Sequence, residues 1–313
     1  LFIMFYMVVI NAVKTKKQFR GLLFFMVCAG VLVSLYGFYQ YMNQGKFGGV
    51  WVDTDMFGSI SFRVYSTLGN PNVLGEYFLL IIPTTVACFI VSKKYIFKAF
   101  YFCAAAVMML CLFTTYSRGC YIGMIMAAGV FLVLLDRRFI ILGILGLMLL
   151  PFILPDTIIN RFMSIGNMND SSTSYRVYIY LGTISMLKDY WLSGIGPGQS
   201  AFNKVYPYYG YNGISAPHSH NTFLQVTCDA GIAGIVVFIA CIYQFYKLLF
   251  RKFMDTKNKT EKIFVIAFMS SLSGFFVQSM TDYTFYNYRV MALFWIYVGL
   301  GALSTIYSEL KEE

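Results

Sequence analysis

The chain has two histidines, and both lie in the segment Pro217-His218-Ser219-His220-Asn221, directly before a long apolar run. A histidine at the boundary of an apolar segment titrates near neutral pH, so it can accept or donate a proton in a reaction. A structural interpretation is equally open, in which Ser219 or Asn221 caps the helix that follows. This segment alone does not decide between a proton-transfer site and a helix start.

Arginines are unevenly distributed between two sets of connections in the chain. Sixteen of the 24 basic residues lie in one set, and only four of those sixteen are arginine. In the other set five of eight are arginine, a residue that binds phosphate or carboxylate through two parallel hydrogen bonds. For any single arginine, anchoring to lipid headgroups is the alternative. Four of the five lie beside polar or glycine residues at predicted helix ends on the same side as His220, which favours a shared site: Arg63, Arg118, Arg176 and Arg289.

The composition is that of a membrane protein. Hydrophobic residues make up 58% of the chain, charged residues make up 12%, and the mean hydropathy is +0.66. A soluble domain would need far more surface charge. The net charge of +10 therefore does not indicate a nucleic-acid partner. The seven cysteines are scattered without disulfide or metal-ligand spacing, no acidic cluster suggests a metal site, and we expect no cofactor.

Apolar segments of roughly the length that crosses a bilayer recur along the chain. By the positive-inside rule, the lysine-rich connections between them are cytoplasmic and the other connections lie outside. The pattern predicts an all-α, polytopic bundle of transmembrane helices with about nine spans, at 1–13 (partial), 21–42, 73–92, 96–116, 119–135, 139–155, 222–249, 263–281 and 290–307.

The first apolar run, Leu1 to Val13, is too short to span and is followed by four basic residues. We interpret it as the end of a helix in a fragment that lacks further N-terminal spans. A signal-peptide core is the alternative, although there the basic residues precede the apolar run. The rest divides into transmembrane helices with an outer loop at 43–72 (1–155), a large extracytoplasmic loop (156–221) and C-terminal transmembrane helices (222–313).

The large outer loop contains its own predicted helix. Residues Ser174 to Tyr190 have helical spacing, with Val177, Leu181, Ile184 and Leu187 on one face. We expect an amphipathic helix that lies on the outer membrane surface and carries Arg176 in its first turn. The glycine-rich run Gly194 to Gly198 follows, where the backbone at Gly196 and Gly198 is able to approach a ligand closely; a plain turn is the alternative.

These segments together resemble a known family. His220-Asn221 is followed after nine residues by Gly231-Ile232-Ala233-Gly234, which is similar to the signature of O-antigen ligases and Wzy-type polysaccharide polymerases. The resemblance extends over roughly residues 60–300. Other segments agree with it in order: Thr67-Leu68-Gly69-Asn70-Pro71-Asn72, Tyr116-Ser117-Arg118-Gly119, Arg176 with Gly194 to Gly198, and Asp282 to Arg289.

The resemblance implies a GT-C-like glycosyltransferase of the bacterial cytoplasmic membrane whose active face is extracytoplasmic. Such enzymes serve polysaccharide and lipopolysaccharide biosynthesis, and they transfer a glycan from undecaprenyl diphosphate to an acceptor sugar hydroxyl without a metal ion. The key arginines and histidine of the family fall on Arg118, Arg176 and His220. The arginines would stabilise the diphosphate leaving group, and neutral histidine would be the general base.

Other residues are expected to contact the donor glycan, the lipid-linked or free glycan acceptor, or the surrounding membrane lipids. Asn221 would orient the imidazole or the acceptor, whereas His218 lies outside the motif and is expected to be a loop residue or a supporting partner. For Arg63 and Arg289, anchoring to lipid headgroups is an equal alternative to substrate binding. The expected substrate contacts besides Asn221 are Arg63, Arg289, Gly196, Gly198, Asn70 and Asn72.

Three functions remain open at this point. A ligase hands a finished glycan to a different acceptor, and the His-Asn and glycine match favours it. A Wzy-type polymerase instead extends one lipid-linked unit of O-antigen, capsule or exopolysaccharide with another. A transporter of the lipid-linked glycan would require ionisable groups near mid-membrane, which the spans almost lack. The tyrosines between Tyr206 and Tyr211 form either an interfacial belt or a platform for sugar stacking.

Overall fold

The computed structural model describes residues 2–47 and 60–312, and within these ranges the chain is helical with no β-strand. The all-α prediction is therefore confirmed. Part of the predicted outer loop at 43–72 falls on residues 48–59, which lie outside the described residues. One isolated backbone bridge joins Thr15 to Lys311 and ties the start of the second helix to the end of the chain.

Each predicted span corresponds to a helix in the structure. The bounds agree to within about six residues, and the helices are α1 (Ile3–Ala12), α2 (Lys16–Met42), α4 (Pro71–Val91), α5 (Tyr95–Thr114), α6 (Arg118–Leu135), α7 (Phe139–Ile153), α11 (Thr222–Asp255), α12 (Lys259–Ser279) and α13 (Tyr288–Ser304).

Among the described residues, six of these helices are long and apolar enough to cross a bilayer, namely α2, α4, α5, α6, α11 and α12. The other three are apolar but shorter, with 10 residues in α1, 15 in α7 and 17 in α13. The structure thus supports a multi-pass membrane protein, while the total of nine spans stays a prediction.

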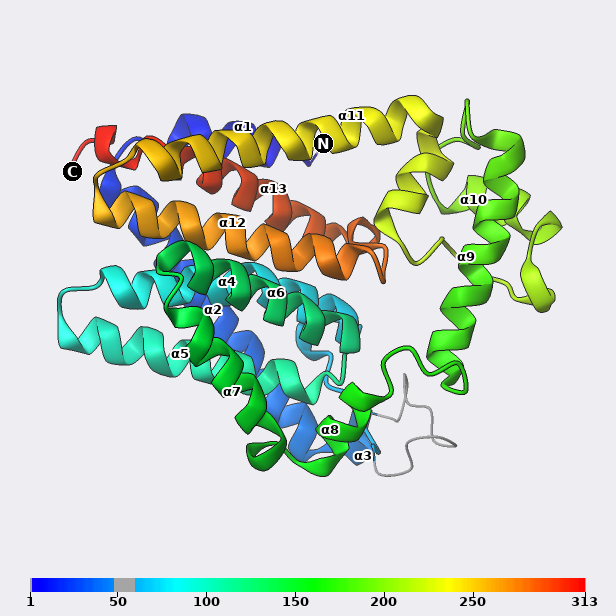
Figure 1. The fold of residues 1–313 in the computed structure, drawn as a ribbon, viewed down its shortest axis with the longest axis horizontal. Coiled ribbons are helices and arrows are strands. Elements are labelled where there is room, and N and C mark those ends of the chain that lie inside the picture. The colour runs from blue at the N-terminus through cyan, green and yellow to red at the C-terminus, as the bar shows by residue number, and fades with distance from the viewer. Residues whose placement is uncertain (1, 48–59, 313) are drawn as a thin grey trace.

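Short helices and turns make up most of one end of the bundle. Figure 1 shows α9 running across this end, roughly at right angles to the long helices. The elements are α3 (Gln44–Phe47), α8 (Asp156–Met163), α9 (Ser171–Tyr190), α10 (Gln199–Val205), and the 3₁₀ turns Ser66–Leu68, Tyr206–Tyr208, Tyr211–Gly213 and Thr284–Tyr286; a further turn, Tyr307–Glu309, lies near the C-terminus.

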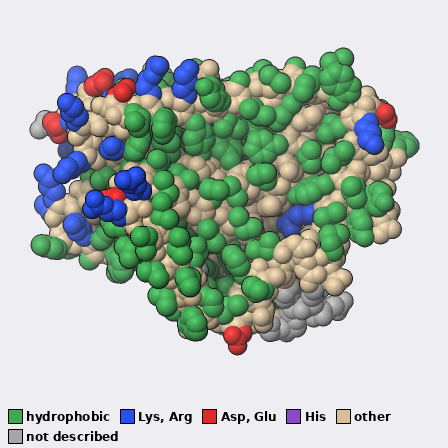
Figure 2. All heavy atoms as spheres, viewed as in Figure 1, with side chains coloured by type: hydrophobic (Ala, Val, Ile, Leu, Met, Phe, Trp, Pro, Cys, Tyr) green, Lys and Arg blue, Asp and Glu red, His purple; other side chains and the backbone are tan. Residues whose placement is uncertain are grey.

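The bundle has two chemically different ends. Figure 2 shows lysine and arginine side chains gathered at the end where Figure 1 places the C-terminus and the α11–α12 connection. We call this the lysine-rich end. The opposite, loop-rich end consists of residues 60–70, 115–117, 154–221 and 280–287. Hydrophobic side chains cover much of the surface between the two ends, as expected for helices that contact lipid (Figure 2).

Helices α4 and α12 form the centre of the bundle, and α12 packs against both α4 and α6. The approach of α6 to α12 depends on two glycines. A Cβ on Gly123 would lie 2.7 Å from the carbonyl oxygen of Gly274, and a Cβ on Gly274 would lie 2.5 Å from the carbonyl oxygen of Gly123. Small residues at such crossings allow close packing of membrane helices, whose association depends on van der Waals contact. This crossing places the start of α6 beside the end of α12.

Helix α9 is present as predicted, but its inward face differs from the apolar face read from the sequence. Ile179, Thr183 and Met186 are buried against the loop-rich end, whereas Leu181 and Ile184 are exposed. Leu187 of the predicted apolar face packs against the same buried residues, so only part of that face is left exposed. Whether it lies on a membrane surface stays a prediction.

Helix α11 is broken at Gly231, where the backbone has φ 62° and ψ −161°. The break separates a short segment from the long helix, as Figure 1 shows. It also frees backbone groups that bind the turn after α9: Ile195 N–H donates to the Cys228 carbonyl at 2.6 Å, and Ile232 N–H donates to the Trp191 carbonyl at 2.8 Å. These bonds fix the first turns of α11, and with them the preceding histidine loop.

Replacing Gly231 by alanine should uncouple α11 from the turn after α9. An added Cβ would lie 2.1 Å from the carbonyl oxygen of Leu192, and the positive φ disfavours any residue with a side chain. We expect Gly231→Ala to lose at least about 2 kcal/mol of stability, measured as thermal unfolding in detergent. Gly129→Ala is the matched control, because a Cβ there meets open space in the middle of α6. Equal melting temperatures for the two variants would contradict this account of the break.

Candidate active site

Several helix N-termini converge at the loop-rich end, and those of α4, α9 and α11 are capped by an Asn or Asp side chain. Asn70 caps α4 by accepting from Asn72 N–H at 2.8 Å, Asp170 caps α9, and Asn221 caps α11. The N-terminus of a helix carries partial positive charge and favours anions. The first turns of α4, α6 and α9 line one cavity, so the fold itself makes that cavity attractive to an anion.

This cavity has a volume of about 210 Å³ and its lining includes four arginines, Arg63, Arg118, Arg161 and Arg176. Burial, together with the neighbouring Arg161 and Arg176, lowers the pKa of Arg63 to about 9. Burial and the neighbouring Arg118 lower the pKa of Arg161 to about 10. Both guanidinium groups remain charged at neutral pH, and both shifts come first from burial and then from the neighbouring positive charges.

Asp170 compensates part of that charge. Arg118 binds it through two parallel hydrogen bonds, from Nη1 to Oδ2 at 2.8 Å and from Nη2 to Oδ1 at 2.9 Å. Arg161 Nη1 also donates to Oδ2, at 3.2 Å. Burial would raise the pKa of Asp170, but hydrogen bonds from Ser172 and Arg118 and the two positive charges hold it below its ordinary value. Asp170 is therefore ionised, and its salt bridges with Arg118 and Arg161 connect α6 and α8 to the start of α9.

Arg118 is consequently held by the protein on several sides. Besides Asp170, its Nη1 donates to the Ser164 carbonyl oxygen at 3.0 Å, and its Nη2 donates to the hydroxyl of Ser172. Arg176 is different. Its Nη1 donates to the Ser172 carbonyl oxygen at 3.3 Å, while its buried Nε has no hydrogen-bond partner among the described residues. A buried donor without a partner is costly, and an anion in the cavity would satisfy it.

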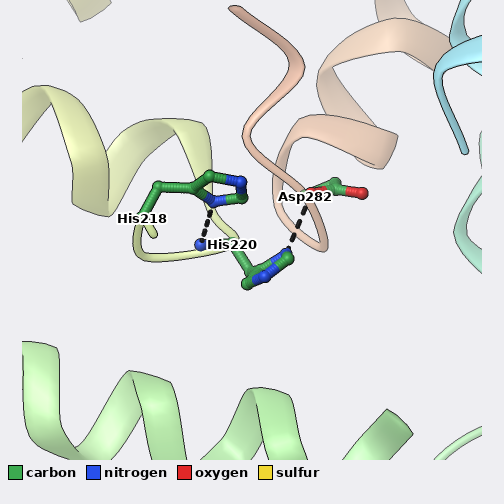
Figure 3. Close-up of side chains that lie close together, drawn as sticks. All are labelled: His218, His220 and Asp282. Atoms are coloured by element: carbon green, nitrogen blue, oxygen red, sulfur yellow. Dashed lines mark hydrogen bonds and ion pairs between the residues drawn. The ribbon is translucent and has the colours of Figure 1, made fainter. Parts of the chain in front are cut away.

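Asn72 links the arginine cavity to the histidine loop. Its Oδ1 accepts from Arg63 Nη2 at 3.1 Å and from Ser117 Oγ at 2.9 Å, and its Nδ2 donates to Asp282 Oδ2 at 2.8 Å. The other oxygen of Asp282 faces Nδ1 of His220 at 3.1 Å (Figure 3). A continuous hydrogen-bonded path therefore runs from Arg63 to His220.

Asp282 orients the imidazole of His220. Burial would raise the pKa of Asp282, but its hydrogen bond to His220 and the positive charge of Arg176 hold that pKa well below the ordinary value. An ionised Asp282 accepts a hydrogen bond from Nδ1–H, so His220 keeps Nε2 as the ring nitrogen that can accept a proton. His220 itself does not line the arginine cavity, but Tyr180, which does, donates its hydroxyl to the His220 carbonyl oxygen at 3.0 Å.

The histidine loop has an unusual backbone. His220 lies in the left-handed region with φ 49°, a conformation that a residue with a side chain adopts at a cost of about 1–3 kcal/mol. Its N–H donates to Nδ1 of His218 at 3.2 Å, and the two rings lie 4.2 Å apart. Burial and the neighbouring His220 lower the pKa of His218 to about 4, so His218 is neutral at neutral pH. The loop is thus held by contacts from both of its histidines.

A comparison with known families completes this description. The family model described as O-Antigen ligase matches residues 103–239, somewhat less than half of the chain. This match confirms the family resemblance that the sequence predicted. No curated protein matches the chain.

The matched segment includes the three predicted catalytic positions, Arg118, Arg176 and His220. The structure brings the two arginines together in the cavity and connects His220 to it through Asp282 and Asn72. Their roles in catalysis stay predictions, as do the roles of the predicted substrate contacts.

The predicted substrate contacts have different positions. Arg63 and Asn72 line the cavity. Asn70 and Asn221 are helix caps, and Asn221 Nδ2 also donates to the Met280 carbonyl oxygen at 2.9 Å. Outside the cavity lining, Arg289 donates to the Thr67 carbonyl oxygen and to the Tyr288 hydroxyl, and the positive-φ glycines Gly196 and Gly198 form the loop before α10.

Sequence reasoning missed three residues that organise this site, namely Arg161, Asp170 and Asp282. Arg161 was counted among the arginines of the loop-rich side but was given no role. Asp170 looked like one of several possible caps for α9, and Asp282 only opened a segment of the family resemblance. Sequence reasoning also found no metal site, yet His218, His220 and Asp282 lie close enough together to hold a cation. No local sequence signal identified the Arg118–Asp170 and His220–Asp282 pairs, because they join residues that are 52 and 62 positions apart.

The neutral state of His218 predicts a pH dependence of stability. In the unfolded chain His218 takes up a proton near its ordinary pKa of 6.5, whereas in the fold it does so only near pH 4. Its contribution to stability is therefore present above about pH 6.5 and is lost as the pH falls towards 4. We expect the melting temperature of the wild type in detergent to fall more between pH 7 and pH 5 than that of His218→Asn, which keeps a hydrogen-bond acceptor. Parallel pH profiles for the two proteins would contradict the burial of a neutral His218.

Proposed function

We propose that this membrane protein is an O-antigen ligase-type glycosyltransferase that transfers a glycan from undecaprenyl diphosphate to an acceptor sugar hydroxyl. The reaction takes place at the loop-rich end, which lies on the extracytoplasmic side of the bacterial cytoplasmic membrane. The observation that carries the proposal is the cavity with four arginines, connected through Asn72 and Asp282 to His220.

The cavity suits a diphosphate. Four guanidinium groups line the cavity, and Asp170 pairs with Arg118 and Arg161 beside it. Helix N-termini add to the positive potential of these groups. Arg176 is the main ligand of the leaving group in this proposal, because its Nε is buried without a partner. Arg118 holds α9 in place through Asp170 and contributes its charge to the same cavity.

His220 is the general base in the proposed reaction. The acceptor hydroxyl gives its proton to Nε2 of His220 as its oxygen bonds to the anomeric carbon of the donor sugar. The bond between that carbon and the diphosphate oxygen breaks, and its electron pair leaves with the diphosphate. Asp282 stabilises the resulting imidazolium through Nδ1, and the arginines stabilise the negative charge on the leaving group. In this mechanism guanidinium groups, in place of a divalent cation, stabilise the charge of the leaving diphosphate.

The acceptor decides between a ligase and a polymerase. A ligase delivers the glycan to a different glycan or lipid-linked glycan, whereas a Wzy-type polymerase delivers it to a second undecaprenyl-diphosphate-linked unit. The site described above is compatible with either acceptor. We favour the ligase on the His-Asn and Gly-x-x-Gly pattern at His220 and Gly231.

Substitutions at the site should separate the proposed roles. With the protein reconstituted in liposomes, we expect His220→Ala to lower kcat by about 10²–10⁴-fold and Arg176→Ala to lower it by about 10²–10³-fold. Asp282→Asn should lower kcat less than His220→Ala and leave the KM for the donor unchanged, because it orients the base without contacting the donor. The measurement is glycan transfer from a labelled undecaprenyl-diphosphate donor, with EDTA present throughout.

Lys188→Ala is the matched control for Arg176→Ala, since it removes an exposed positive charge from the same helix. It should retain the wild-type rate. Full activity of His220→Ala or Arg176→Ala would show that the site is misassigned. Loss of wild-type activity in EDTA would refute the metal-free mechanism. Movement of the donor across the bilayer without transfer would indicate the lipid-linked glycan transporter.

A further inference from the structure

An apolar groove lies between α11, α12 and α13, which run side by side (Figure 1). It has a volume of about 400 Å³, and hydrophobic side chains such as Ala230, Phe276 and Trp295 line almost all of it. Beyond the break at Gly231, no residue of α11 from 232 to 248 is buried, so this helix packs loosely on its two neighbours. Helices in a membrane associate through van der Waals contact, and a hydrocarbon in the groove would supply the contact that the loose packing lacks.

The groove is about as deep as one leaflet of a bilayer. Its lining on α11 includes Gly234 near one end and Tyr246 near the other, and the helix rises by roughly 18 Å between them. Because the hydrocarbon core of a bilayer is about 30 Å thick, one leaflet measures roughly 15 Å. The hydroxyls of Tyr246 and Ser273 form a hydrogen bond of 2.9 Å, which joins α11 to α12 at the deep end of the groove. The groove therefore suits a hydrocarbon chain that enters from the leaflet at the loop-rich end.

The mouth of the groove lies beside the histidine loop. Phe285 lines the groove and follows Asp282 in the same loop after α12. Val226 also lines it, in the first turns of α11 that follow His220. Since Asp282 orients the imidazole of His220, the elements that form the mouth are the ones that hold the proposed base. The head group of a lipid in this groove would therefore lie next to His220.

The surface at this mouth suits a sugar. Tyr286, the residue after Phe285, is exposed, and its ring lies 4.7 Å from that of His218. Its hydroxyl donates to Oε1 of Gln199, which is also exposed, at 3.4 Å. An aromatic ring can pack on the apolar face of a pyranose, while amide and hydroxyl groups bind its hydroxyls. An apolar groove with such a mouth matches a glycolipid, whose sugar and hydrocarbon chain are joined end to end.

The groove and the arginine cavity lie on different sides of α12. Leu272 and Phe276 line the groove, whereas Gln278 lines the arginine cavity. Phe276 and Gln278 are two residues apart, so at 3.6 residues per turn they point to nearly opposite sides of the helix. A lipid chain in the groove therefore does not compete for space with a diphosphate bound by the arginines. It reaches the site from the side of the second substrate.

We propose that this groove binds the hydrocarbon chain of the glycan acceptor, which is a membrane-anchored glycolipid. The sugar of the acceptor lies against Tyr286 and presents its hydroxyl to His220, while the diphosphate of the donor lies in the arginine cavity on the other side of α12. The lining, depth and mouth of the groove support a glycolipid site, whereas its use by the acceptor rests on the proposed function. A free glycan without a lipid anchor would be a poor acceptor.

Tryptophan fluorescence tests the occupant of the groove directly, because Trp295 lines it. The chain has three tryptophans, so Trp51→Phe with Trp191→Phe leaves Trp295 as the reporter. The protein is placed in lipid nanodiscs and titrated with a dibromododecyl maltoside, whose bromine atoms quench indole fluorescence on contact. We expect saturable quenching that unbrominated dodecyl maltoside reverses. Dibromo-phosphatidylcholine should quench only in linear proportion to its mole fraction.

Cys241→Phe should narrow the groove, because Cys241 lines it partway along α11. Cys103→Phe is the matched control, since Cys103 is also an exposed cysteine of an apolar helix but lies on α5, outside the groove lining. We expect Cys241→Phe to bind the dibromododecyl maltoside about tenfold more weakly than the wild type, which corresponds to the loss of roughly ten close carbon contacts. Cys103→Phe should bind it as the wild type does.

Transfer kinetics then show which substrate uses the groove. Unbrominated dodecyl maltoside should inhibit glycan transfer competitively against the acceptor and non-competitively against the undecaprenyl-diphosphate donor, and free maltose should not inhibit. Cys241→Phe should raise the KM for a lipid-anchored acceptor by about tenfold. The KM for the donor should stay within about twofold of the wild type in the same variant.

The outcomes separate this inference from the proposed function. Linear quenching by both brominated probes means that ordinary bilayer lipid fills the groove, and absence of quenching means that a protein segment covers it; either result overturns the proposal. Inhibition that is competitive with the donor assigns the groove to the donor's chain and also overturns it. Equal binding by Cys241→Phe and the wild type overturns the location of the site. Saturable binding in a protein that transfers no glycan supports the glycolipid site and counts against the proposed function alone.

Discussion

The structure depends on the compensation of like charge at the edge of a membrane. Four guanidinium groups share one cavity with several helix N-termini, and every one of these groups is positive. Such charges repel strongly where water is scarce. Asp170 pairs with Arg118 and Arg161, while burial and neighbouring arginines lower the pKa values of Arg63 and Arg161. A cavity lined by these guanidinium groups and by helix N-termini attracts an anion.

Two carboxylates, Asp170 and Asp282, each hold a different part of the loop-rich end together. Asp170 begins α9 and at the same time holds Arg118 and Arg161, so the outer helix cannot form its first turn without also placing the arginines. Asp282 joins His220 to Asn72 at the start of α4. The break at Gly231 then fixes the first turns of α11 against the end of α9. Local helix capping, tertiary docking and charge compensation thus use the same few side chains.

The sequence predicted the helices well because bilayer-length apolar runs and charged connections are strong, local signals. It also predicted that Arg63, Arg118 and Arg176 lie on one side with His220. It could not identify the partners of these residues, because pairing between Asp282 and His220 depends on how distant helices pack. The sequence also did not show which face of α9 packs on the protein. Ile179 and Met186, which lie outside the predicted apolar face, are buried against the loop-rich end, whereas Leu181 of that face is exposed.

The separation between the base and the arginine cavity fits a reaction with two large substrates. His220 is outside the cavity lining, and its Nδ1 is occupied by Asp282, so a proton donor must approach Nε2. Tyr180 lies between the two regions, since it lines the cavity and also donates to the His220 carbonyl oxygen. An anion bound by Arg176 would therefore leave the base accessible to a second substrate. The left-handed backbone of His220 places the imidazole at that boundary, where the proposed reaction requires proton transfer and departure of the leaving group to meet.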